Sequence, residues 1–405
     1  MDALRCSAIL PTGTRKVTYN SHTKMTNIIH FISDDKFTTM IVNEFQILDG
    51  KVNNHYIIPI KGHINNYKFI DPKISQYIKQ IKVWNINSYI RKNKIDIVIL
   101  HNLYSLHFIN ILLLPSNIKI VWFAWGKDLY CLPEDKPFIE MELYGEETRK
   151  FIKPEYKPIL KAIKSKITGY FYRKAIQRVD YFSGVLPKEY TLMKQVEGFK
   201  AKELDFSYAT VSKDPELKIN RERVTGKNIL VGNSGDETNN HLDIFKCLSQ
   251  YELGETLVYV PISYAGSKEY REKVIRVGKK LWSDRFIPLE TFMPLEEYNK
   301  IISSCGIRIF AHERQQAVGN ISSALALGCK VFLSETSMAY DFYKRNDLRV
   351  FSLQKDLTYE NITTLLPNED VLHNMDTFIN KRNPYYFYKK LVILVETIEA
   401  DIIDK

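Results

Sequence analysis

The feature that most constrains this chain is the alternation of short β-rich runs with amphipathic helical patterns along almost its whole length. Such alternation predicts parallel sheets, because parallel strands need a crossover connection that a helix supplies. Two series of this kind occur in the sequence. The strands are expected near 28–33, 56–60, 95–101, 120–124 and 181–185 in the first series, and near 228–232, 257–261, 286–289, 307–311 and 330–334 in the second. The sequence therefore predicts an α/β protein with two Rossmann-like, doubly wound domains that face a cleft.

The expected helices lie near 37–48, 103–113, 241–253, 268–282, 295–305 and 321–327. A polar stretch at 212–227, with Pro215 and Gly226, is typical of a linker. We therefore divide the chain into an extension outside the fold at 1–24, a first domain at 25–220 and a second domain at 221–384. The first domain is expected to include a basic helix at 148–178 and the last helix at 385–405.

Several classes of protein are disfavoured by the sequence. The longest apolar runs, at 108–115 and 391–395, are far shorter than the roughly 20 residues that span a bilayer. The five cysteines show neither CxxC spacing nor clustering with histidine, which disfavours a zinc site and a disulfide framework. Residues 1–24 lack the pattern of a signal peptide. We expect a cytoplasmic protein without a membrane-spanning helix.

The net charge of +10 is concentrated in one segment, 148–178, which has ten basic residues and one acidic residue. Apolar and aromatic residues recur there at helical spacing: Leu160, Ile163, Ile167, Tyr170 and Phe171. The segment is either an ordinary surface helix whose stripe faces the core, or a contact with anionic lipid head groups. The candidate lipid contacts are Lys157, Lys161, Lys164 and Lys166. No nucleic-acid-binding motif accompanies the charge, so no nucleic acid is expected.

The run "AHERQQAVGN", 311–320, follows one expected strand and leads into a helix that should begin near Asn320. Arg314 can form paired hydrogen bonds with phosphate oxygens, and Gln315 and Gln316 can bind hydroxyl or amide groups. Gly319 allows close backbone approach, and the helix N-terminus attracts an anion. These features predict a site for a phosphorylated ligand. The alternative is that the side chains only cap and cover the loop.

A second motif, "ILVGNSGDETNN", ends the first strand of the same domain. Its residues Gly232, Asn233, Ser234 and Gly235 can hold a diphosphate through backbone amides and a hydroxyl group. Taken alone, this run also describes a common turn. The chain lacks the GxGxxG and GxxxxGK[ST] patterns of nicotinamide enzymes and P-loop proteins. We therefore expect the nucleotide to be a substrate and expect no cofactor.

Taken together, five short motifs resemble the bacterial TDP-4-acetamido-4,6-dideoxy-D-galactose:lipid II transferases of enterobacterial common antigen synthesis, in the 4-alpha-L-fucosyltransferase family. The resemblance runs from about residue 25 to 351 and rests on "HFISDD", "WFAWGKDLY", "VGNSGD", "VPISY" and "RQQAVG". It implies a GT-B glycosyltransferase fold, a TDP-sugar donor in the second domain and a polyprenyl-diphosphate-linked saccharide acceptor facing the first. It also implies a place at the inner, anionic face of the cell membrane. The donor-binding candidates it implies are Gly232, Asn233, Ser234, Gly235, Arg314, Gln315, Gln316 and Gly319, with Tyr264 as a possible neighbour of the nucleotide. Asn320, at the expected helix start, is a further donor-binding candidate.

Glycosyl transfer needs charge to stabilise the leaving diphosphate, which Arg314 and the helix N-terminus would supply. If the anomer inverts, it also needs a base. Asp128 is our first candidate for the base and Asp35 the second, with His101 and Trp125 on the acceptor side of the cleft. As alternatives, the two aspartates cap helices, His101 is a core residue and Trp125 packs the interdomain wall. The run "SDD" is similar to a metal-binding DXD motif but precedes a helix of the acceptor domain, so no metal is predicted.

Two functions other than transfer stay open from the sequence. One is a nucleotide-sugar epimerase or hydrolase with the same fold, which would give the basic segment 148–178 no role. The other is a non-catalytic protein that binds a nucleotide or a membrane, in which acidic residues of the cleft would be dispensable.

Overall fold

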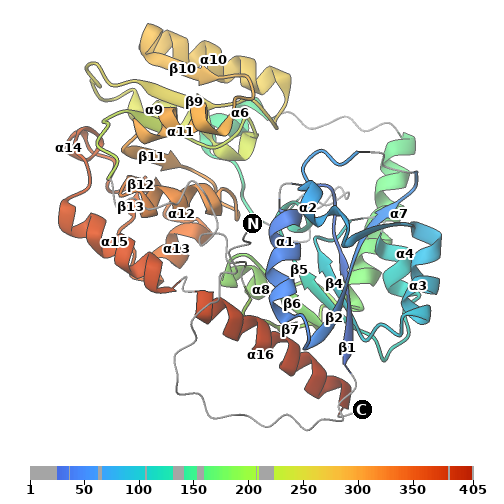
Figure 1. Ribbon diagram of the computed structural model, residues 1–405. Helices are drawn as coiled ribbons and strands as arrows, with labels where there is room; N and C mark the ends of the chain where they lie inside the picture. Colours follow the sequence, from blue (N-terminus) through green and yellow to red (C-terminus); the bar gives the residue numbers. More distant parts are fainter. Residues whose placement is uncertain are drawn as a thin grey trace, which may run out of the picture.

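The computed structural model describes residues 25–35, 37–62, 66–104, 107–130, 141–152, 159–206, 208, 223–381 and 384–403. It contains two α/β domains, each built on a parallel sheet, which lie side by side (Figure 1). This arrangement confirms the predicted fold class. The expected extension at 1–24 and most of the expected linker at 212–227 lie outside the described residues.

The sheet of the first domain has the strand order β3-β2-β1-β4-β5-β6-β7, and every neighbouring pair is parallel. Its strands are β1 (Thr26–Phe31), β2 (Val52–Ile60), β3 (Ile78–Lys82), β4 (Ile97–His101), β5 (Lys119–Phe123), β6 (Tyr181–Ser183) and β7 (Lys202–Glu203). The central strands β4 and β5 are buried along their whole length, because helices cover both faces of the sheet. The helical elements are α1 (Thr38–Phe45), η1 (Gln46–Leu48), α2 (Pro72–Ser75), η2 (Val83–Asn85), α3 (Ile86–Lys92), α4 (Phe108–Leu112), α5 (Lys127–Tyr130), α7 (Ile159–Gln177) and α8 (Pro187–Met193).

The sheet of the second domain has the order β10-β9-β8-β11-β12-β13 and is also parallel. Its strands are β8 (Ile229–Val231), β9 (Val258–Pro261), β10 (Phe286–Leu289), β11 (Ile307–Phe310), β12 (Lys330–Leu333) and β13 (Phe351–Ser352). Its helical elements are η5 (Glu237–Asn239), α9 (His241–Leu248), α10 (Lys268–Trp282), η6 (Ser283–Arg285), α11 (Leu295–Ser303), α12 (Val318–Ala326), α13 (Met338–Arg345), α14 (Tyr359–Thr363) and α15 (Asn368–Lys381).

The structure adds three strands that the sequence analysis missed. Strand β3 reads IKQIK and lies at the edge of its sheet, where charged side chains interrupt the apolar pattern. Strands β7 and β13 have two residues each, too few for a recognisable period. Two helix starts also differ from the prediction. Helix α4 begins at Phe108 and not near residue 103. Helix α12 begins at Val318, so Gly319 and Asn320 belong to its first turn.

The chain crosses between the domains near its end. Helix α16 (Pro384–Ile403) follows the second domain but packs on the first, where Leu391 and Ile398 join the same buried cluster as strand β1 (Figure 1). Asp401 near its end accepts a hydrogen bond from the Tyr181 hydroxyl at 2.5 Å and pairs with Lys202 at 2.8 Å.

The chain also crosses to the second domain earlier, within the basic segment 148–178. Helix α6 (Glu146–Phe151) precedes α7 in sequence but packs against α9 of the second domain (Figure 1). The carboxylate of Asp243 accepts the backbone N–H groups of Glu147 (2.8 Å) and Thr148 (3.0 Å), which would otherwise lack partners at a helix start. The expected single basic helix at 148–178 is therefore divided, with α6 on the second domain and α7 on the first.

Candidate active site

A cleft of about 2220 Å³ lies between the two domains, lined by loops at the carboxyl ends of both sheets. In open parallel sheets these ends are where ligands usually bind. From the first domain, Phe37, Trp125 and Tyr208 line the cleft. From the second domain, the loops after β8, β9, β10, β11 and β12 all reach it.

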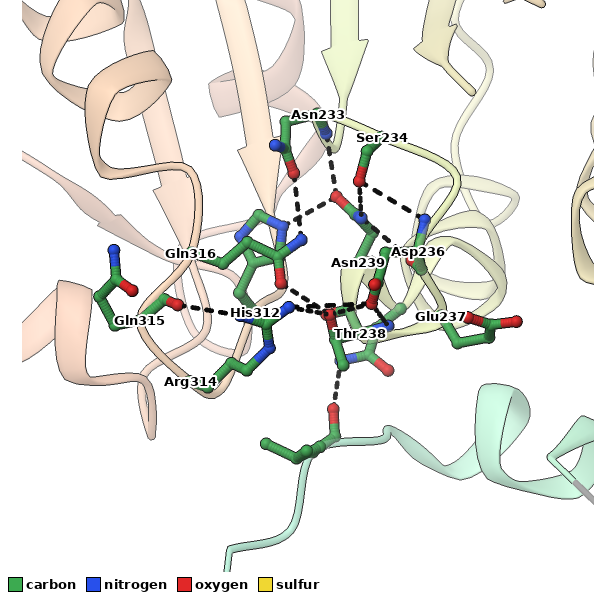
Figure 2. Close-up of polar contacts among 12 residues, drawn as sticks. Asn233, Ser234, Asp236, Glu237, Thr238, Asn239, His312, Arg314, Gln315 and Gln316 are labelled. Carbon is green, nitrogen blue, oxygen red and sulfur yellow. Dashed lines mark hydrogen bonds and ion pairs between the residues drawn. The ribbon is translucent and has the colours of Figure 1, made fainter. Parts of the chain in front are cut away.

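Figure 2 shows the polar corner of the second domain, where the loops after β8 and β11 meet. Asn239, a fully buried residue, organises the first loop. Its Oδ1 accepts the Asn233 N–H at 2.9 Å and the His312 Nε2–H at 2.8 Å, and its Nδ2 donates to the Ser234 hydroxyl at 3.2 Å. Burial lowers the pKa of His312 well below its ordinary value, so this imidazole is neutral at physiological pH. Asn239 thus ties the two loops together.

Thr238 links the same corner to the Arg314 loop. Its hydroxyl donates to Gln316 Oε1 at 2.6 Å, and Gln316 Nε2 donates to Asn233 Oδ1 at 3.2 Å. The guanidinium group of Arg314 donates to Thr238 Oγ1 at 3.4 Å and lies 3.9 Å from the Asp236 carboxylate. Asn233, Arg314 and Gln316 are therefore brought together and line the cleft, as the two sequence motifs predict.

Other predicted donor-binding residues do not present their side chains to the cleft at this corner. The side chain of Gln315 points away from this cluster (Figure 2) and reaches Gly126 of the first domain, where an added Cβ would lie 2.4 Å from Gln315 Oε1. Ser234 is buried, and its hydroxyl is occupied by Asn239. Gly235 packs against the loop after β9, where its N–H donates to the Tyr264 carbonyl oxygen at 2.8 Å. Ser234, Gly232 and Gly235 are not among the cleft-lining residues, so they shape the loop rather than its surface.

The N-terminus of α12 faces the cleft, because Ala317, Val318, Gly319 and Asn320 are among the residues that line it. No side chain among the described residues caps this helix, and the first helical hydrogen bond runs from the Ile321 N–H to the Ala317 carbonyl oxygen at 2.8 Å. The space in front of Gly319 is open. Uncapped N–H groups beside Arg314 make this corner suitable for an anion such as a diphosphate.

The sequence pattern of the family described as "4-alpha-L-fucosyltransferase glycosyl transferase group 56" matches residues 168–380, more than half of the chain. The protein belongs to this glycosyltransferase family. Membership makes it a transferase that uses a nucleotide sugar, which removes the epimerase, hydrolase and non-catalytic alternatives. The matched region includes every residue of the polar corner described above.

Solved structures similar to this family member share its fold at low sequence identity. A glycosyltransferase from Rickettsia africae matches with a TM-score of 0.59 and 12% identity, over 93% of this chain and 99% of that one. Anabaena HepE in complex with UDP and glucose gives 0.59 and 8%, over 93% and 100%. Sucrose-phosphate synthase from Thermosynechococcus elongatus gives 0.59 and 10%, over 93% and 100%. These similarities support the GT-B fold.

The transferase's first-domain candidates differ in how they meet the cleft. Trp125 lines the cleft and packs edge-on against Phe37, with ring centroids 4.4 Å apart. His101 is buried and is bonded on one side to His30, with 2.9 Å between ring nitrogens, and on the other to the Tyr208 hydroxyl. Burial lowers the pKa of His101 well below its ordinary value. His101 therefore lies behind the cleft wall, in agreement with the alternative that it is a core residue.

Asp128 of the transferase is also buried and does not line the cleft. One carboxylate oxygen accepts the Trp122 Nε1–H at 2.7 Å and the Leu103 N–H at 3.0 Å, and the other accepts the Trp125 N–H at 2.9 Å. Burial raises its pKa, although these three donors oppose the rise. The geometry therefore favours a structural role for Asp128 and disfavours our first choice of base.

Asp35 is partly exposed and stands two residues before the cleft-lining Phe37. Its carboxylate accepts the Phe37 N–H at 2.9 Å and the Ser33 hydroxyl at 2.5 Å. The neighbouring Asp34 binds the backbone N–H groups of Lys68 and Phe69 at 2.7 and 3.0 Å. Among the described residues, no three His, Cys, Asp or Glu side chains gather in a way that could hold a metal ion.

One interdomain contact, next to Arg314, was not predicted from the sequence. The guanidinium group of Arg314 lies 5.9 Å from the centre of the Tyr130 ring, a cation–π distance. The Tyr130 hydroxyl donates to Glu189 at 2.9 Å and lies 3.7 Å from the Met338 sulfur of the second domain. Glu189 is fully buried, and burial raises its pKa to about 7. Tyr130 ends the quoted "WFAWGKDLY" motif, but no local pattern identifies a buried acid on α8.

The apolar stripe of α7 faces solvent in this transferase, not the core. Leu160 is 82% exposed, and Ile163, Ile167 and Tyr170 are each at least half exposed. Lys164 and Lys166 are exposed beside them, whereas Lys157 and the side chain of Lys161 lie outside the described residues. The opposite side of α7 packs inward through Tyr172, Ala175 and Ile176. The helix therefore has a second apolar side that no described part of the chain covers.

Proposed function

We propose that the protein transfers an amino-deoxy sugar of the 4-acetamido-4,6-dideoxygalactose type from a TDP-sugar to a polyprenyl-diphosphate-linked saccharide in bacterial surface polysaccharide synthesis. The observation that carries the proposal is the polar corner at the cleft, with Arg314 beside the uncapped start of α12. The motif resemblance given above supplies the sugar and the acceptor class. The anionic inner face of the cell membrane is the proposed place of reaction.

In the proposed reaction, an acceptor hydroxyl oxygen bonds to C1 of the donor sugar as the bond from C1 to the diphosphate oxygen breaks. Negative charge then develops on the leaving diphosphate. Arg314 and the first-turn N–H groups of α12 stabilise this charge without a cation. Gln316 and Asn233 hold the adjoining part of the donor by hydrogen bonds, because their amides lie at the same corner.

The acceptor saccharide faces the first domain in this proposal, with Trp125 as the aromatic surface beneath a sugar ring. If the anomer inverts, Asp35 takes the proton of the attacking hydroxyl. Asp35 is favoured over Asp128 because it is partly exposed next to the cleft wall, whereas Asp128 is buried and does not line the cleft.

Helix α7 would hold the enzyme against the membrane that contains the acceptor. Among the described residues, no helix is long and apolar enough to cross a bilayer. Helix α7 packs against α4, where Ile109 and the following Leu113 are 59% and 65% exposed. Apolar side chains beside the five basic residues of α7 suit an anionic lipid surface, to which each basic residue contributes about 1 kcal/mol.

The membrane role can be tested with vesicles that contain anionic lipid. Replacing Lys157, Lys161, Lys164 and Lys166 by glutamine should weaken vesicle binding by up to about 4 kcal/mol, and added salt should do the same. The matched control replaces four lysines of α10 on the other domain: Lys268, Lys273, Lys279 and Lys280. Transfer to a short, water-soluble acceptor should survive in both variants. Unchanged vesicle binding, or equal failure on soluble and lipid-linked acceptors, would contradict the membrane role.

The transfer reaction is tested by incubating the protein with the TDP-sugar, with and without the polyprenyl-diphosphate saccharide, and following release of TDP. We expect release that depends on the lipid-linked acceptor, together with a product that contains the amino-deoxy sugar. Equal release without any acceptor would contradict the proposed transfer.

A further inference from the structure

One end of the cleft has an aromatic and apolar surface that the polar corner does not use. The sheet order β10-β9-β8-β11 places the loops after β9 and β10 on the far side of β8 from the Arg314 loop. The cleft residues at the ends of β9 and β10 and in these two loops include Tyr264, Leu289, Phe292 and Met293. Charged and amide side chains therefore gather at the β8 and β11 end, and aromatic and apolar side chains, beside the hydroxyl groups of Ser263 and Thr291, gather at the β9 and β10 end.

Two exposed aromatic side chains lie at matching positions in these loops. Phe292 is 92% exposed, and no large hydrophobic side chain among the described residues is more exposed. Tyr264 is 52% exposed. Pro261 and Leu289 pair across β9 and β10, and each aromatic residue follows its member of that pair by three positions. Exposing a phenyl ring in a cleft wall is unfavourable in water, so a ligand with a flat apolar face would stabilise this arrangement.

We infer that Phe292 and Tyr264 form the subsite for the nucleobase of the donor. This inference rests on the proposed use of a nucleotide sugar and adds which residues hold its base. Three strand spacings of about 4.8 Å separate β11 from β10, or about 14 Å in all. A nucleotide whose diphosphate binds at Arg314 thus extends along the sheet edge toward the two rings. Tyr264 also joins the two regions, because its hydroxyl lies 3.5 Å from Asn233 Nδ2.

Stacking recognises the face of a base, which uracil and thymine share, rather than its edge. The subsite is therefore expected to bind UDP and TDP with similar gains from the two rings. Selection between donors then depends on the sugar end of the molecule. The rival explanation for Phe292 is a contact with lipid or acceptor, which would leave nucleotide binding unchanged when the ring is removed.

The test measures binding of UDP, TDP and inorganic diphosphate to the full chain by calorimetry. The variants are Phe292→Ala and Tyr264→Ala, with Tyr359→Ala as the control, since Tyr359 is 56% exposed and does not line the cleft. We expect each cleft variant to bind both nucleotides about 5- to 150-fold more weakly and to bind diphosphate as the wild type does. The control should bind all three ligands like the wild type. Because Phe292 is exposed, its loss should not affect folding.

Each other result has a defined meaning. Wild-type nucleotide affinity in Phe292→Ala, an equal loss of diphosphate binding, or a loss confined to one nucleotide would overturn the base subsite alone. Weaker binding of Phe292→Ala to anionic vesicles with unchanged nucleotide binding would assign the ring to lipid instead. If the wild-type protein binds neither nucleotide, the proposed donor class fails, and the base subsite fails with it.

Discussion

Replacing Glu189 by glutamine should make the protein more stable than the wild type above neutral pH. The Glu189 side chain is fully buried near the start of α8. One oxygen accepts the Leu186 N–H and the other accepts the Tyr130 hydroxyl, both at 2.9 Å. These two donors replace only part of the water that a carboxylate binds, so burial raises the pKa of Glu189 from an ordinary value of 4.5 to about 7.

The size of the effect follows from this pKa difference. Each pH unit between 4.5 and about 7 is worth about 1.4 kcal/mol, which gives about 3 kcal/mol in total. Because the folded state binds the proton more tightly than the unfolded state, this stability is fully present below pH 4.5 and is lost as the pH rises through 7. Glutamine has no charge to bury, so the Glu189→Gln variant lacks this loss.

Urea unfolding of both proteins at pH 5 and pH 8 measures the difference. We expect the free energy of unfolding of Glu189→Gln, relative to the wild type, to rise by about 2–4 kcal/mol between the two pH values. Glu203→Gln is the control, because Glu203 is exposed on β7. If the difference between Glu189→Gln and the wild type is the same at pH 5 and pH 8, Glu189 is already ionised in the folded protein and the reasoning is wrong.

Three further predictions concern the reaction. Arg314→Ala should cost about 2–4 kcal/mol of transition-state stabilisation, measured from the fall in kcat/KM for transfer. A wild-type rate in steady-state kinetics would remove Arg314 from the mechanism. Transfer should persist in EDTA, because protein groups meet the diphosphate charge; activity lost in EDTA and restored by magnesium or manganese would contradict this. Asp35→Asn should lower kcat about 10²- to 10⁴-fold. Asp128→Asn should mainly reduce the free energy of unfolding, by about 1–3 kcal/mol, because its amide group would face an N–H donor. The reverse result would restore Asp128 as the base.

The sequence predicted the meeting of Asn233, Arg314 and Gln316 because strand-end loops of neighbouring parallel strands share one edge, and β8 and β11 are neighbours. It did not predict which side chains at a strand end face the cleft. Asp128 follows β5 as expected, yet the Trp122 indole of that strand draws its carboxylate inward. Asn239 was missed because its role depends on tertiary hydrogen bonds to two loops. Position along the chain carries neither kind of information.

The sequence also did not predict that residues assigned to the first domain contact the polar corner of the second. Asn240 accepts the Gly145 N–H at 2.9 Å through Oδ1. Its Nδ2 donates to the carbonyl oxygens of Leu143 at 3.1 Å and of Ala311 at 2.7 Å, and Ala311 begins the Arg314 loop. The corner is thus supported by a segment that precedes α7 in the chain.

Arg314 itself is contacted from both domains, by Thr238 of the second and by the Tyr130 ring of the first. Its contact with Thr238 lies within one domain, so a change in domain separation can leave it intact. Its contact with Tyr130 lasts only while the domains are close. The orientation of the group that would stabilise the leaving diphosphate therefore depends on the interdomain arrangement, which links closure of the cleft to the chemistry proposed for it.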